Sequence, residues 1–135
     1  MTNEGHRADV VQYWWAKAER SLASAGRELE AEEFSFAMNR VYYAAFYAVS
    51  AALLERHSPF KKHSGIRSAF HREFIKTGLL DIQWAKFYDQ LFEDRQEGDY
   101  VASIAFEREY VERQMERCAE FLAQLRPLVS SLKRS

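Results

Sequence analysis

The sequence predicts an all-α fold, an antiparallel up-and-down bundle of four to five helices, and three observations support this. Apolar residues recur at steps of three and four, the period of one helix face. Only 5 Gly and 2 Pro occur among 135 residues, too few for the frequent turns of a β protein. Hydrophobic residues make up 47% of the chain, enough for the core of a single domain spanning residues 1–135.

The first two predicted helices have the clearest apolar patterns. The first runs from about Ala8 to Glu30, with one apolar stripe along it. The second runs from about Phe34 to Glu55 and is apolar nearly all round, which is typical of a central helix covered by its neighbours. Small residues in it would let those neighbours approach closely: Ala37, Ala44, Ala45, Ala48, Ala51 and Ala52.

A lone arginine, Arg40, lies within this second helix, in line with Phe36, Tyr43 and Tyr47. A charged side chain there must pair with an opposite charge or reach water. Two interpretations stay open. Arg40 is either structural, in an ion pair or with only its stem buried, or it is the arginine of a functional site.

The third and fourth predicted helices have identifiable ends. The third runs from about Ser64 to Thr77, and Gly78 follows it where a left-handed glycine often ends a helix. The fourth starts at Asp81, a good N-cap residue, and runs to about Gly98.

The fifth predicted helix begins near Phe106 and has a heptad-like apolar seam. Cys118 lies on this seam, which favours a core residue over a nucleophile. Because proline cannot donate a backbone hydrogen bond, Pro127 predicts a kink or an end near Gln124.

A second arginine interrupts the apolar stripe of the fourth helix. Four residues after Leu91, the stripe reaches Arg95, so a guanidinium takes a core-facing or interface-facing position. Asp99 lies four residues further on, and Tyr100 follows where the pattern breaks. An internal Arg95–Asp99 bridge and a functional site are both compatible with this spacing.

The histidines give a candidate anion site but no metal site. His63 stands at the start of the third helix beside Lys61, Lys62 and Arg67, where the helix dipole attracts anions. A solvated helix start would look the same. No two histidines are spaced at i, i+4 and no glycine-rich phosphate loop occurs, so we expect neither a metal nor a cofactor.

Charge and cysteine content narrow the function classes further. The formal net charge is −1, so nucleic-acid binding would have to use a local basic patch. One cysteine allows no intrachain disulfide, and we expect a cytoplasmic protein. Neither a signal peptide nor a membrane-spanning run is visible, so no membrane association is expected.

Three sequence blocks occur in a recognisable order. The first is NRVYYAAFYA at residues 39–48, the second is KHSG at 62–65 with FIKTG at 74–78, and the third is RQEGDY at 95–100. Together they resemble small stand-alone HEPN (higher eukaryotes and prokaryotes nucleotide-binding) proteins, whose pattern for the first block is SRxYYAxFHA. The resemblance covers about residues 7–125 and implies a helical bundle that commonly dimerises.

The resemblance also implies possible partners and activities. Many such proteins are similar to partners of a minimal nucleotidyltransferase in two-component, toxin–antitoxin-like systems. Nuclease members cut RNA without metal, using an Arg-x(4–6)-His motif from both subunits. Arg95 matches the arginine of that motif, but the three positions open to the histidine are Tyr100, Val101 and Ala102.

Three hypotheses follow. The first is a homodimeric module whose polar cleft binds a nucleotide, RNA or a partner nucleotidyltransferase. The second is a metal-independent ribonuclease in which His63 acts with Arg95. The third is a polar cluster that only orders the bundle and its dimer interface. Besides Arg95 and His63, the residues expected at the cleft are Arg40, Asp99, Tyr100, Tyr43 and Tyr47.

Overall fold

A computed structural model of the protein describes the backbone of residues 3–57, 63–100 and 106–132, and the side chains of these except residues 3–4, 63–64 and 96–100. The described residues form five α-helices and contain no strand. They are α1 (Asn3–Glu30), α2 (Phe34–Glu55), α3 (His63–Phe70), α4 (Ile82–Tyr100) and α5 (Arg108–Leu125). The predicted all-α bundle is confirmed.

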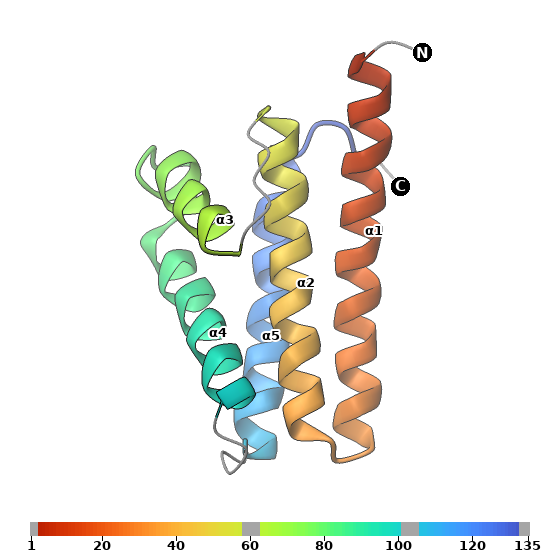
Figure 1. Ribbon diagram of the computed structural model, residues 1–135, viewed down its shortest axis with the longest axis vertical. Coiled ribbons are helices and arrows are strands. Elements are labelled where there is room, and N and C mark those ends of the chain that lie inside the picture. Colours follow the sequence, from red (N-terminus) through yellow and green to blue (C-terminus); the bar gives the residue numbers. More distant parts are fainter. Residues whose placement is uncertain (1–2, 58–62, 101–105, 133–135) are drawn as a thin grey trace.

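The helices form an antiparallel bundle with α2 at its centre (Figure 1). Along the chain, α1, α2, α4 and α5 alternate in direction, and α3 is inserted between α2 and α4. Helix α2 contacts each of the other four α-helices. No helix in the described part of the chain is long and apolar enough to cross a membrane.

The central position of α2 has a direct basis in its sequence. All six alanines that were expected to allow close approach are fully buried. Tyr42 fills the space toward α4 and is only 1% exposed. One side of α2 nevertheless stays open to solvent, since Phe36 is 62% exposed and Arg40 is also exposed. The expectation of a helix covered nearly all round therefore holds except along this side.

Two predicted helix ends are confirmed by local geometry. Asp81 precedes α4, and its carboxylate accepts a hydrogen bond from the Gln83 backbone N–H at 2.9 Å. Gly78 has φ +81°, a conformation that glycine adopts without the steric penalty of a side chain. After α5, a 3₁₀ turn (Arg126–Leu128) contains Pro127, as expected for a residue that cannot continue the α-helical hydrogen bonds.

The third predicted helix differs most from expectation. It is α-helical only to Phe70, and a π-helical turn, η1 (His71–Ile75), continues it. The Lys76 N–H donates to the His71 carbonyl at 2.8 Å, five residues back instead of four. Phe70 and Phe74 still reach the core on either side of this change, and both are fully buried. Burial of both rings accompanies the wider turn.

Candidate functional site: a polar cleft between α2 and α4

A cleft of about 330 Å³ opens between the start of α2 and the later part of α4. Helix α2 contributes residues 35, 36 and 38–40 to its wall, and α4 contributes Asp94 and Arg95. Phe106, just before α5, also lines the cleft. Two arginines far apart in the sequence, Arg40 and Arg95, therefore line the same cavity.

Arg40 presents its charge to this cleft. Its side chain is exposed, and it forms no ion pair with any side chain that the structure describes. The Arg40 backbone is fixed, because its carbonyl accepts a hydrogen bond from the Ser21 hydroxyl of α1 at 2.8 Å. Both an exposed guanidinium on a partly buried stem and a functional-site arginine fit this placement.

Arg95 is half-buried and held against the aromatic face of α2. Its Nη2 donates to the Tyr43 hydroxyl at 3.4 Å, a long hydrogen bond. Its guanidinium carbon lies 5.2 Å from the ring centroid of Tyr42 and 5.6 Å from that of Tyr43. Cation–π attraction at these distances orients the group. Burial raises the pKa of Tyr42 to about 12 although the Arg95 charge lowers it, so this phenol is neutral at physiological pH.

Asp94, which the sequence analysis missed, is the acidic residue of the cleft. It is only 7% exposed, and its carboxylate accepts hydrogen bonds from Gln90 Nε2 at 2.8 Å and from the Tyr110 hydroxyl at 2.5 Å. Gln114 Nε2 donates to the same hydroxyl at 3.1 Å. Burial raises the pKa of Tyr110, and the hydrogen bond to Asp94 raises it further. This network ties α4 to α5 and occupies the carboxylate beside Arg95.

No helical spacing could have shown the role of Asp94, because its partner Tyr110 comes from α5, sixteen residues further along the chain. The available signal was composition: an acidic residue directly before an arginine in an apolar stripe. The i, i+4 pair Tyr110 and Gln114 was a second signal, since both are polar and share a helix face.

The other residues that the sequence predicted for the cleft do not all lie there. Tyr43 joins the site through its bond to Arg95. Tyr47 is not brought to the cleft; it packs against α1, with its ring 5.4 Å from that of Trp14 and 4.8 Å from Lys17 Nζ. The side chains of His63, Asp99 and Tyr100 lie outside the described residues.

Cys118 is a core residue, as its place on the apolar seam predicted. It is fully buried, and its Sγ donates to the Val41 carbonyl at 3.8 Å. Burial raises the pKa of its thiol to about 12, which disfavours the reactive thiolate. Among the described side chains, no group of three or more His, Cys, Asp or Glu could hold a metal ion.

Comparison with known proteins identifies the family. The family profile described as HEPN domain matches residues 11–128. The chain belongs to the HEPN domain family. A "UPF0332 protein" of Thermotoga maritima is 41% identical over 126 residues, which cover 93% of this chain and 96% of that protein.

Two relatives from Methanocaldococcus jannaschii have toxin names. "Putative toxin MJ0142" is 40% identical over 96 residues, covering 71% of this chain and 65% of that protein. "Putative toxin MJ0605" is 28% identical over 92 residues, covering 68% of this chain and 69% of that protein. This HEPN protein is therefore similar, over about two thirds of its length, to proteins named as toxins.

Proposed function

We propose that this HEPN protein is the toxin-like component of a two-component pair with a minimal nucleotidyltransferase, and that its cleft binds phosphate groups of RNA or nucleotides. The observation that carries the proposal is the convergence of Arg40 and Arg95 on one cavity. Guanidinium groups bind phosphate oxygens through paired, charge-assisted hydrogen bonds. The toxin names of the two relatives support the same class of function.

The cleft favours an anionic ligand although it contains a carboxylate. Asp94 is buried and already accepts two hydrogen bonds, so its charge is partly compensated within the protein. Arg40 is exposed, and Arg95 is oriented by the aromatic rings below it. A phosphate in the cleft would contact one exposed arginine and one that is held against aromatic rings.

The proposal includes a homodimer formed through the open side of α2. Phe36 lines the cleft and is 62% exposed, a large apolar surface to leave in water. A second copy that covered Phe36 would also bring its own cleft close to the first. Sedimentation at high protein concentration tests this, since a species of only 15.9 kDa would contradict it.

Binding of a short labelled RNA, and of AMP, to variants of the two arginines tests the cleft. Arg40→Ala and Arg95→Ala should each weaken binding about tenfold or more, because each removes charged hydrogen bonds to the ligand. Arg20→Ala removes an exposed charge from α1 and serves as the matched control. Equal weakening by all three variants would show that only overall charge matters.

The same variants separate a binding role from a purely structural one. If Arg95 only orders the bundle, Arg95→Ala should lower the melting temperature while Arg40→Ala should not affect binding. Copurification with a nucleotidyltransferase encoded beside this protein tests the partner. Absence of both a partner and any RNA or nucleotide binding would refute the proposal.

A further inference from the structure

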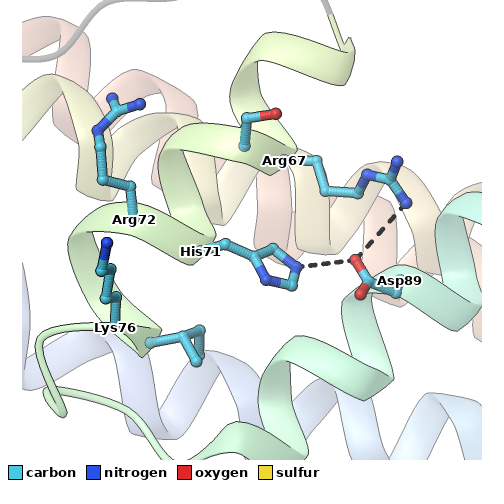
Figure 2. Close-up of a pocket in the computed structure, with 7 residues that line it drawn as sticks. Arg67, His71, Arg72, Lys76 and Asp89 are labelled. Carbon is cyan, nitrogen blue, oxygen red and sulfur yellow. Dashed lines mark hydrogen bonds and ion pairs between the residues drawn. The ribbon is translucent and has the colours of Figure 1, made fainter.

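A second polar groove, of about 630 Å³, lies on the side of the bundle formed by α3, η1 and α4. The groove residues with charged or titratable side chains are Arg67, His71, Arg72, Lys76 and Asp89 (Figure 2). Three basic side chains and one carboxylate therefore line the groove. None of these residues lines the α2–α4 cleft.

His71 is fixed in this groove by Asp89. Its Nε2 lies 2.9 Å from Asp89 Oδ1. Since an ionised carboxylate can only accept hydrogen bonds, Nε2 must carry the proton. Figure 2 shows the imidazole pointing from η1 toward α4, with its other ring nitrogen turned away from Asp89. That nitrogen is unprotonated, so it can accept a hydrogen bond from a ligand in the groove.

Arg67 is held in place by two contacts. Its Nη1 lies 3.7 Å from the same Asp89 oxygen, and its guanidinium carbon is 4.2 Å from the ring centroid of Phe92. Its side chain is 35% exposed, so the stacked guanidinium still reaches the groove. A planar cation held over an aromatic ring loses little freedom when it binds a phosphate.

Arg72 and Lys76 form the opposite side of the groove. They are four residues apart, so they share one face of the helical segment and lie together on one side of His71 (Figure 2). Arg72 Nη2 lies 3.4 Å from Glu73 Oε2, so the Glu73 carboxylate offsets part of the Arg72 charge. Lys76 is exposed and makes no ion pair with the described side chains. The groove thus keeps a net positive charge after its internal pairs are counted.

The groove and the cleft are neighbours along one helix. Asp89 and Arg95 are six residues apart on α4, about 9 Å at the usual rise per residue. Between them, the ring of Phe92 under Arg67 lies 6.3 Å from the ring of Tyr42 under Arg95. The two basic regions therefore lie within two turns of each other on α4, a separation that a polymer with several phosphates can span.

From this geometry we propose that the α3–η1–α4 groove binds the phosphate backbone of single-stranded RNA, as a second contact region beside the α2–α4 cleft. Arg72 and Lys76 bind phosphate oxygens on one wall, and Arg67 does so on the other, beside His71, whose unprotonated ring nitrogen can only accept a hydrogen bond. Two basic regions this close on one helix fit a polymer with repeated charges better than a free nucleotide. The inference rests on the proposed RNA binding and names a separate region for it.

The test compares two double variants that remove the same charge. Arg72→Ala/Lys76→Ala alters the groove, and Arg20→Ala/Arg27→Ala alters exposed positions on α1. All four side chains are exposed, and alanine is compatible with a helix, so both proteins should fold. Melting temperatures check this. The probe is a short fluorescein-labelled single-stranded RNA, with AMP and polyglutamate as unlabelled competitors.

We expect the groove variant to raise the Kd for RNA about tenfold or more, and the α1 variant to raise it less than about threefold. The groove variant should also reduce the slope of log K against log salt by about 1.4, because two phosphate contacts are lost at about 0.7 each. The inference would be overturned if the two variants raised the Kd for RNA equally. It would also be overturned if AMP or polyglutamate displaced the RNA at concentrations similar to that of the RNA.

The outcome also separates this inference from the proposed function. If Arg40→Ala and Arg95→Ala weaken RNA binding but the groove variant does not, the cleft binds RNA and the groove does not. If the wild-type protein binds no RNA at all, this inference fails, whereas the proposed function fails only if AMP binding and the partner are absent as well.

Discussion

The hydrogen bond between Tyr110 and Asp94 gives the sharpest test of how the cleft is built. In Tyr110→Phe the ring can keep its stacking on Phe106, at 6.0 Å between centroids, while the hydroxyl is lost. Asp94 is 7% exposed and would keep only the hydrogen bond from Gln90. Gln114 Nε2 would lose its acceptor as well.

A hydrogen bond to a charged group contributes about 1.5–3 kcal/mol, and a neutral one contributes about 1 kcal/mol. Tyr110 is half-buried, so water can replace part of what is lost. We therefore expect Tyr110→Phe to lower the free energy of unfolding by about 2 kcal/mol. For a domain of this size, that corresponds to a fall in melting temperature of about 6–8 °C.

Urea denaturation followed by circular dichroism measures this difference. Tyr13→Phe is the matched control, because Tyr13 is 53% exposed and lies outside the network. It should change stability by less than about 0.5 kcal/mol. If Tyr110→Phe is as stable as the wild type, the Asp94–Tyr110 bond does not hold α4 against α5, and our account of the cleft is wrong.

Three further predictions concern pH, the groove and catalysis. Burial raises the pKa of Tyr42 to about 12, so the stability due to its proton is complete below about pH 10 and is lost as the pH rises to about 12. Relative to Tyr42→Phe, the wild type should lose about 2 kcal/mol of its free energy of unfolding across that range. Parallel curves of unfolding free energy against pH for the two proteins would contradict this. Asp89→Asn keeps an acceptor for His71 but removes the negative charge, so RNA binding should tighten several-fold, and weaker binding would argue against the groove. If the protein is a ribonuclease, RNA cleavage in EDTA should stop in Arg95→Ala and in His63→Ala; cleavage that survives both would exclude that mechanism.

Local patterns in the sequence were sufficient to predict most of the fold. The alanines and apolar residues of α2 required neighbours on most sides, and the structure places four helices around it. Asp81 and Gly78 marked helix ends correctly, because capping and left-handed backbone depend on a few adjacent residues. The π-helical turn at His71 was not predictable, since it accompanies the burial of Phe70 and Phe74 against other helices.

For the candidate sites too, the sequence predicted some features and only the packing of the helices decided the others. The sequence by itself singled out Arg40 and Arg95, because each is a charge on an otherwise apolar helix face, and the family blocks around them support the HEPN assignment. Only the tertiary structure decided that these arginines share one cleft, that Asp94 bonds to Tyr110, and that His71 meets Asp89. Each of these contacts joins residues on different helices. Their proximity depends on how the helices pack, which helical periodicity within one segment does not encode.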